Sequence, residues 1–130
     1  MQPLIINATE SSPEIICNPE ENVFEISGDS RPENANEFYT PLLKWLDAYK
    51  VEIQYNHSPK PCVFKFDFEY LNSISIKYAF ELLKRIEALK AAGLNVEIHW
   101  YYAKRDEDIR ENGNEFATLV SVPLKVIQKD

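Results

Sequence analysis

The chain has 130 residues, 45% of them hydrophobic, which suits one core, so we expect residues 1–130 to form a single domain. Lys and Arg total 14 against 21 Asp and Glu, and the resulting net charge of −7 would repel the phosphates of nucleic acid or of an anionic membrane surface. No nucleic-acid or membrane partner is therefore expected. No stretch is apolar enough to span a bilayer, and no basic segment followed by an apolar one opens the chain, so we expect a cytoplasmic protein.

The first half of the chain predicts three strands and one helix. Short β-branched runs at Leu4–Ile6 and Glu14–Cys17 indicate two small strands, and Val23–Ser27 indicates a clearer one. Gly28–Asn34 is rich in residues that hydrogen-bond their own backbone or fix φ, so we expect a loop there. The helix that follows is indicated by apolar side chains at helical spacing, which are Phe38, Leu42, Trp45, Leu46 and Tyr49.

The start of this helix carries two signals. Asn34, followed three residues later by Glu37, is a favourable N-cap pattern. Pro41 lacks a backbone donor and crowds the preceding turn. Either the helix kinks at Pro41, or Thr40 caps a fresh helix with Pro41 at its first position.

The second half begins with the strongest patterns in the sequence. After an expected loop at His57–Pro61, the segment Cys62–Tyr70 alternates apolar and polar residues and predicts a strand. Apolar side chains between Ile74 and Ala92 share one helical face, and Gly93 ends this helix.

The remaining elements have weaker signals. Val96–Tyr101 alternates as another strand, and Asp106–Thr118 indicates a helix that Gly113 weakens. Val120–Ile127 predicts a last strand, and Pro123 indicates that it begins late or lies at a sheet edge.

A comparison across the strands predicts the architecture. On each strand, apolar side chains point to one face of the sheet and form an apolar file, and polar side chains point to the other face and form a polar file. Helices covering the polar file would bury unpaired charges at a cost of several kcal/mol each. We therefore expect an α/β fold, a two-layer sandwich in which a mixed sheet carries its helices mainly on the aromatic face. The polar file comprises Glu25, Lys65, Asp67, Glu69, Glu97, His99 and Lys125.

The sequence carries no enzyme or cofactor signature. The densest acidic cluster, Asp106–Asp108, opens a helix, where the helix dipole explains acids without catalysis. His57 and His99 lie at no ligand spacing from a cysteine, so we expect no metal site. Cys17 and Cys62 form no CxxC pair and are expected to be buried free thiols of a reducing compartment. Three glycines form no nucleotide-binding loop, and we expect no cofactor.

The junction between the strongest strand and the next helix is the most informative segment. Asn72, Ser73 and Ser75 supply more polar side chains than one N-cap requires, and they place a hydroxyl at a helix start. Free backbone N–H groups and the positive end of the helix dipole favour an anion there, so Ser73 is a candidate phosphorylation site. Capping alone would also explain these residue types. The apolar Ile74 is a candidate contact for a docking protein.

Two sequence blocks resemble the SiaC family, small bacterial regulatory phosphoproteins with a fold similar to STAS domains. The first is Gly28–Asn34 with Phe38 and Trp45 after it, which is similar to the family's G-D-S-x-P-E-N segment and amphipathic helix. The second is Tyr70–Ser75, which resembles the family's Y-L/F-N-T-S-S turn. A third and weaker block is His99–Tyr102.

The resemblance implies a non-enzymatic partner-switching regulator. Ser73 stands where the family's threonine accepts phosphate from a cognate serine/threonine kinase, a PP2C-type phosphatase removes that phosphate, and Ile74 replaces a family serine. The unphosphorylated family protein binds and stimulates a diguanylate cyclase, which raises cyclic di-GMP and promotes biofilm formation. The residues expected to contact partners are Asn72, Ile74, Ser75, Asp29, Arg31, Glu33 and Asn34.

Two other functions fit the same residues. A STAS-like adaptor of the anti-sigma-factor antagonist type would switch partners without a cyclase. A small-ligand-binding domain would contact its ligand through the loop Gly28–Asn34. A pull-down with the unphosphorylated protein as bait distinguishes the adaptor from a cyclase regulator by the protein that it retains. A ligand-dependent rise in thermal stability would identify the ligand-binding domain.

Overall fold

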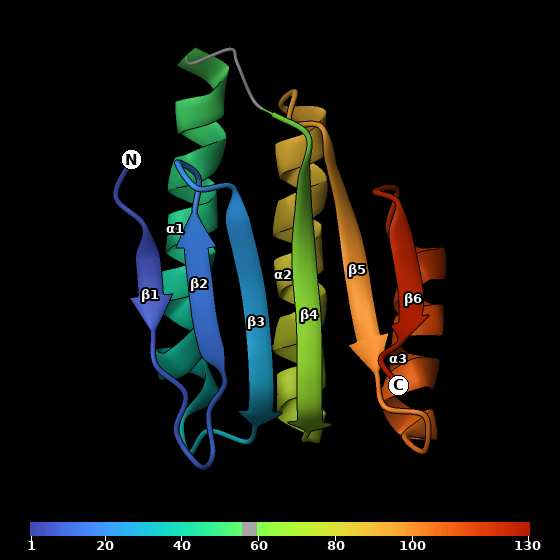
Figure 1. Cartoon of the computed structure of the whole chain (residues 1–130). Helices are drawn as coiled ribbons and strands as arrows, with labels where there is room; N and C mark the ends of the chain where they lie inside the picture. Colours follow the sequence, from blue (N-terminus) through green and yellow to red (C-terminus); the bar gives the residue numbers. More distant parts are fainter. Residues whose placement is uncertain (56–59) are drawn as a thin grey trace.

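The computed structural model describes residues 1–55 and 60–130, which form six strands and three helices (Figure 1). In chain order the elements are β1 (Leu4–Ile6), β2 (Glu14–Asn18), β3 (Val23–Ser30), α1 (Ala35–Tyr55), β4 (Cys62–Leu71), α2 (Ser73–Ala91), β5 (Val96–Tyr102), α3 (Glu107–Leu119) and β6 (Leu124–Gln128). The loop expected at His57–Pro61 lies mostly outside the described residues. Every predicted strand and helix is present, with ends that differ by a few residues.

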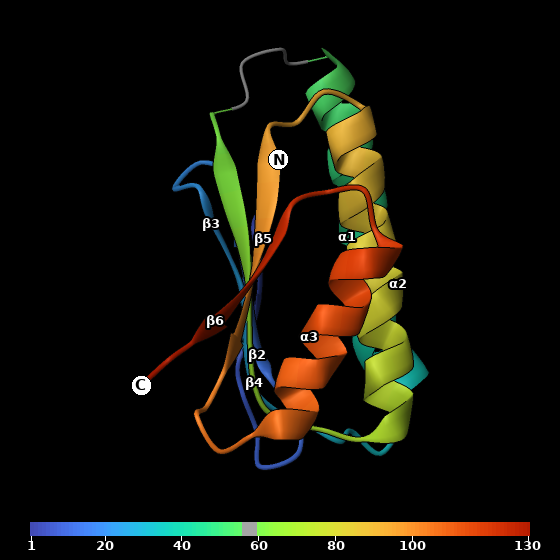
Figure 2. The same cartoon turned by 90° about the vertical axis from the view of Figure 1, so that its right-hand side faces the viewer.

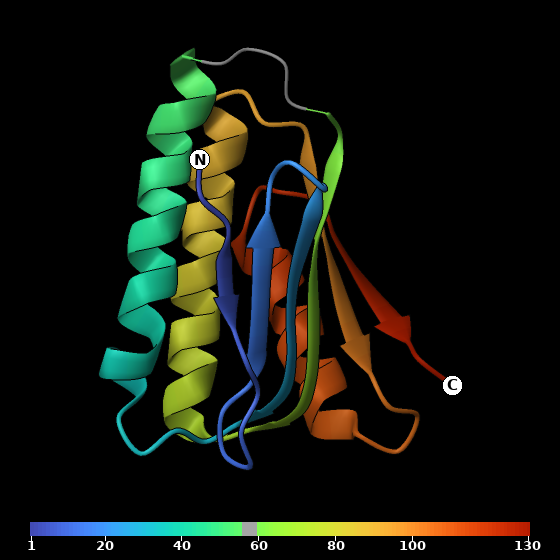
Figure 3. The same ribbon diagram turned by 60° about the vertical axis from the view of Figure 1, so that its left-hand side comes forward.

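The strands form one sheet in the order β1-β2-β3-β4-β5-β6. β1, β2 and β3 pair antiparallel, whereas β3, β4, β5 and β6 pair parallel. Each parallel connection passes through one helix, and all three helices cover the same face of the sheet (Figure 2). Figure 3 shows the opposite face without a covering helix. The predicted mixed sheet with helices on one face is confirmed.

The covered face of the sheet is the aromatic file that the sequence predicts. Phe64, Phe66 and Phe68 of β4 are at most 4% exposed. Trp100 of β5 is fully buried, and its ring centre lies 5.6 Å from that of Phe66. The Nε1 of Trp100 donates a hydrogen bond to the carbonyl of Ile109 at 2.8 Å, which joins β5 to α3. The core therefore lies between this file and the three helices.

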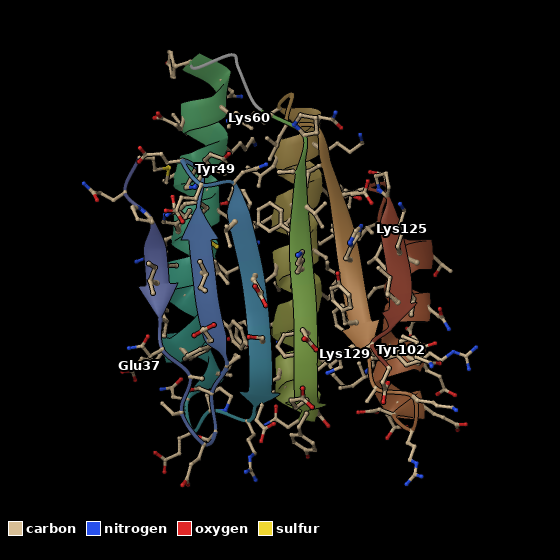
Figure 4. All side chains as sticks on the ribbon, viewed as in Figure 1. Glu37, Tyr49, Lys60, Tyr102, Lys125 and Lys129 are labelled. Atoms are coloured by element: carbon tan, nitrogen blue, oxygen red, sulfur yellow. The ribbon has the colours of Figure 1, made fainter. Side chains whose placement is uncertain are left out.

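The other face of the sheet carries the predicted polar file (Figure 4). Lys129 Nζ lies 2.8 Å from Asp67 Oδ1 and 2.9 Å from Glu69 Oε1. On β5, Glu97 Oε2 lies 2.7 Å from His99 Nε2. These charged side chains are partly exposed and paired, which agrees with the prediction that no helix covers this face.

The first block departs from the predicted loop because β3 continues past Ser27. The parallel neighbour β4 still offers backbone hydrogen-bonding groups there, so Gly28, Asp29 and Ser30 extend the strand. The register shifts between Gly28 and Asp29, and Gly28 has a φ of +114°, a value that residues with a Cβ rarely adopt. Three residues expected in a loop are therefore held in the sheet.

Helix α1 runs without interruption through Pro41. Its predicted N-cap is confirmed, since Asn34 Oδ1 accepts a hydrogen bond from the N–H of Glu37 at 3.0 Å. Thr40 does not cap a fresh helix, because its Oγ1 donates to the carbonyl of Asn36 at 2.6 Å inside the same helix. Pro41 cannot donate to the carbonyl of Glu37, and both residues are exposed, so this loss falls on the accessible side of the helix.

The last two elements show why their sequence signals are weak. Gly113 lies inside α3, where a Cβ would approach Trp100 Cδ1 to 2.4 Å, so the helix needs glycine in order to pack on that ring. β6 begins at Leu124, just after Pro123, and lies at the edge of the sheet, as Pro123 predicts.

Candidate functional site

The two sequence blocks meet at the carboxyl ends of β3 and β4. Ser30 pairs with Leu71 in the parallel register, and the backbone N–H of Asn72 donates to the carbonyl of Ser30 at 3.1 Å. Both strands end at the lower edge of the sheet in Figure 1, where α2 begins. Sites in open α/β sheets gather at this edge. The fold thus brings together two blocks that are far apart in sequence.

Ser73 is the first residue of α2 and is exposed. Asn72 is the N-cap, and its Oδ1 accepts a hydrogen bond from the N–H of Ser75 at 2.9 Å. The carbonyl of Asn72 accepts from the N–H of Ile76 at 3.0 Å, which completes the first helical turn. The expected placement of an accessible hydroxyl at this helix start is confirmed. Phosphorylation of Ser73 stays a prediction.

Ser75 lies in the interior, although the sequence places it among the partner-contacting residues. Ser75, Ser30 and Tyr39 are each 0% exposed. The Ser30 hydroxyl donates to Ser75 Oγ at 2.7 Å, and since a hydroxyl has one proton, Tyr39 must donate the hydrogen bond that it shares with Ser30. The third residue of α2 turns towards the end of β3, so Ser75 presents nothing to a partner in this conformation.

Sequence reasoning missed Ser30 and Tyr39. Tyr39 lies at helical spacing from Leu42 and Leu46, so it belongs to the buried stripe of α1. Ser30 continues the inward-facing file of Phe24 in β3. When the strand is predicted to end at Ser27, the inward-facing position of Ser30 is not recognised.

Burial controls the titration of the hydroxyl and thiol groups in the interior. It raises the pKa of Tyr39 to about 12, while hydrogen bonds to Ser30 and Ser75 pull that pKa down. The Tyr39 hydroxyl therefore stays neutral at physiological pH. Burial also raises the pKa of Cys17 and Cys62 to about 12, and both are free thiols, as predicted. Protonated buried thiols are poor nucleophiles.

The other candidate residues of the first block lie near the turn. Asp29 pairs with Tyr70 in the β3–β4 register, and its carboxylate lies 3.9 Å from Arg31 Nη2. Both partners are solvent-accessible, so this pair contributes little to stability. Glu33 and Asn34 are exposed, and Asn34 serves as the N-cap of α1. Their partner contacts stay predictions.

A hollow of about 260 Å³ lies between the start of α2 and the start of α3, and we call it the α2–α3 hollow. It is lined by Tyr70, Leu71, Ile76, Asp106, Asp108, Ile109, Glu111 and Asn112. Ser73 precedes the lining residue Ile76 by three positions on α2, and residues three apart on a helix are neighbours. Tyr70 is 50% exposed and Ile74 is 49% exposed. Two accessible apolar side chains therefore flank Ser73 in the turn.

The acids at the start of α3 serve the helix, as predicted. Asp106 is the N-cap, and its Oδ1 accepts from the N–H of Ile109 at 3.1 Å. Within residues 1–55 and 60–130, no group of three or more His, Cys, Asp or Glu side chains could hold a metal ion. None of the helices described there is long and apolar enough to cross a membrane.

Comparison with known proteins identifies the family. The chain matches the sequence model of the SiaC family regulatory phosphoproteins over residues 6–129. The chain belongs to the SiaC family. An uncharacterised protein of Pseudomonas aeruginosa strain UCBPP-PA14 is 28% identical over 130 residues, which cover 100% of this chain and 99% of that protein. The resemblance drawn from the two sequence blocks is confirmed.

Solved structures of SiaC from Pseudomonas aeruginosa share this fold. Apo-SiaC superimposes with a TM-score of 0.84 at 28% identity, over 99% of this chain and 100% of that one. SiaC has also been crystallised as the activator in a complex with the diguanylate cyclase SiaD. That structure matches with a TM-score of 0.84 at 28% identity, over 97% of this chain and 99% of the matched chain.

Proposed function

We propose that this SiaC-family protein is a non-enzymatic switch controlled by phosphate on Ser73. A cognate serine/threonine kinase phosphorylates Ser73, and a PP2C-type phosphatase hydrolyses the phosphoserine. The unphosphorylated protein binds and activates a diguanylate cyclase and so raises cyclic di-GMP. The observation that carries the proposal is the exposed Ser73 at the start of α2. Its relative in Pseudomonas aeruginosa activates the diguanylate cyclase SiaD, which supports the choice of partner.

A phosphate on Ser73 would leave α2 intact. It adds roughly −1.5 to −2 charge at neutral pH and three acceptor oxygens. The N–H groups of Ser73 and Ile74 occupy the first two helical positions, where the helix supplies no acceptor, and the helix dipole is positive there. Exposed Lys77 lies four residues further along the same helical face and adds a favourable charge. The phosphate therefore acts on what can dock, and the helix remains folded.

The surroundings of Ser73 fit a protein partner. Tyr70 and Ile74 are half exposed, and tyrosines are frequent anchors of protein interfaces. A partner that covers them must remove water from Ser73 as well. A phosphate there would lose its hydration and collide with the partner, so phosphorylation lowers the affinity for the cyclase.

Two substitutions at Ser73 test the effect of charge on docking. Ser73→Ala should bind the cyclase as the unmodified protein does, and Ser73→Asp should bind at least about tenfold more weakly, because a carboxylate in a desolvated contact is costly. Asn95→Asp is the matched control, because it adds one negative charge at an exposed position between α2 and β5, at the opposite end of the sheet. Titration calorimetry and cyclic di-GMP production measure the outcome. Equal affinities for the two Ser73 variants would contradict the mechanism.

The acceptor and the partner are tested separately. After co-expression with the kinase, intact mass and site-localised peptide analysis should find one phosphate, on Ser73, which the phosphatase removes. Ser73→Ala should take up no phosphate. Unphosphorylated bait that retains an anti-sigma-factor kinase and no diguanylate cyclase would overturn the cyclase assignment.

A further inference from the structure

Three buried hydroxyls join the start of α2 to β3 and α1. Tyr39 of α1 donates to Ser30 of β3, and Ser30 donates to Ser75 of α2 at 2.7 Å. Each of the three residues is 0% exposed. The ring of Tyr39 stacks on that of Tyr78, with ring centres 5.4 Å apart and planes 10° from parallel, which holds Tyr39 between α1 and α2.

The end of β3 also holds the backbone of the turn. The carbonyl of Ser30 accepts from the N–H of Asn72, and Asn72 Oδ1 accepts from the N–H of Ser75. Ser30 thus binds the residue before Ser73 through its carbonyl and the residue two after Ser73 through its hydroxyl. These two hydrogen bonds fix the backbone on both sides of Ser73 and so fix the orientation of Ser73.

We propose that Ser30 is a positioning residue that makes Ser73 the single phosphate acceptor of this turn. Its hydrogen bond to Ser75 keeps the first turn of α2 closed, with Ser73 outside and Ser75 occupied inside. This inference rests on the proposed function and adds the residue that decides which hydroxyl is modified. In the transfer, Ser73 Oγ forms a bond to the γ-phosphorus of a nucleoside triphosphate. At the same time the bond between that phosphorus and the oxygen bridging it to the β-phosphorus breaks. The nucleoside diphosphate leaves, and the hydroxyl proton passes to the kinase.

Loss of the Ser30 hydroxyl would release this arrangement. Ser75 and Tyr39 would each lose the hydrogen bond that they share with Ser30, which is unfavourable in the interior. Helix ends already open more readily than helix centres, so the first turn of α2 would open more often. An open turn exposes the hydroxyl of Ser75, and the kinase then meets two acceptors two residues apart.

Amide hydrogen exchange tests the closed turn without any partner. In Ser30→Ala, exchange at the N–H of Ser75 should be about tenfold faster relative to amides in the middle of α2. Tyr39→Phe is the matched control, because it removes a hydroxyl from the same chain of bonds but keeps the one between Ser30 and Ser75. Ile86→Val removes one methyl group from the buried centre of α2. In both controls this relative exchange should stay within about twofold of the wild type.

Site-localised peptide analysis after reaction with the kinase provides the second readout. We expect phosphate on Ser73 alone in the wild type and in both controls, and on Ser73 and Ser75 in Ser30→Ala. Unchanged exchange at Ser75, or phosphate confined to Ser73 in Ser30→Ala, would overturn the positioning role. A wild-type protein left unmodified at Ser73 would instead overturn the proposed function, and the exchange experiment would still decide whether Ser30 holds the turn.

Discussion

Replacing Gly113 by alanine tests whether α3 rests directly on Trp100. In the middle of a helix, alanine is favoured over glycine by about 1 kcal/mol. The added Cβ, however, would lie 2.4 Å from Cδ1 and 2.8 Å from Nε1 of Trp100. Carbon atoms in contact lie about 3.5–4.0 Å apart, so the ring and the helix must separate by roughly 1 Å.

Trp100 has little room to move. Its ring centre lies 5.6 Å from that of Phe66 and 5.3 Å from that of Phe116, and its Nε1 donates a hydrogen bond to the carbonyl of Ile109. Overpacking of a core costs about 1–3 kcal/mol, and weakening this hydrogen bond adds about 1 kcal/mol. After the gain in helix propensity is subtracted, we expect Gly113→Ala to lower the free energy of unfolding by about 1–3 kcal/mol.

Urea unfolding followed by circular dichroism measures this loss. In a chain of this size, the thermal midpoint should fall by roughly 4 °C for each kcal/mol. Asn114→Ala is the control, because the neighbouring position is exposed and gains helix propensity, so this variant should be at least as stable as the wild type. A Gly113→Ala protein that matched or exceeded the wild type in stability would refute the argument from close packing.

Other substitutions test the N-cap of α2, an ion pair and the docking surface. Asn72→Ala should cost about 1 kcal/mol and lower the thermal midpoint, and Asn72→Ser should restore it; no change in Asn72→Ala would contradict the cap. Hydrogen bonds from Lys84, and then from Ser121, lower the pKa of Glu87 from 4.5 to about 2. A carboxyl whose pKa falls on folding stabilises the protein above its unfolded pKa and ceases to do so as the pH drops through its folded pKa. Glu87→Gln should therefore reduce stability near neutral pH and have no effect below about pH 2, as measured by urea titration; an equal loss at both pH values would exclude this linkage. Tyr70→Ala should change the free energy of unfolding by less than about 0.5 kcal/mol and still weaken cyclase binding in calorimetry, whereas unaltered affinity would remove Tyr70 from the docking surface.

Local patterns are sufficient to locate the turn that carries Ser73. Alternation in β4 predicts its buried file, because one face of that strand packs and the other is wet. Helical spacing predicts α2 as far as Gly93, whose φ of +115° fits the residue after a helix. The place of Ser73 follows from where the two patterns meet.

Features that depend on register or on distant segments escape such patterns. The burial of Ser75 depends on an end of β3 that passes Gly28 through a shift in register. The α2–α3 hollow joins the end of β4 to the start of α3, and no local periodicity relates them. Gly113 weakens the helix signal in the sequence, because glycine is needed there for packing against Trp100, which belongs to another element.

The two tryptophans stand in different surroundings and supply built-in fluorescent probes. Trp45 is partly buried, and its Nε1 donates to the carbonyl of Gln2 at 2.9 Å. Trp100 is buried and donates a hydrogen bond to the carbonyl of Ile109, which lines the α2–α3 hollow. In a Trp45→Phe protein, the remaining indole emission arises next to that hollow. A partner that settles there would reach this indole through Ile109, so a change in emission on docking could be timed without an attached dye.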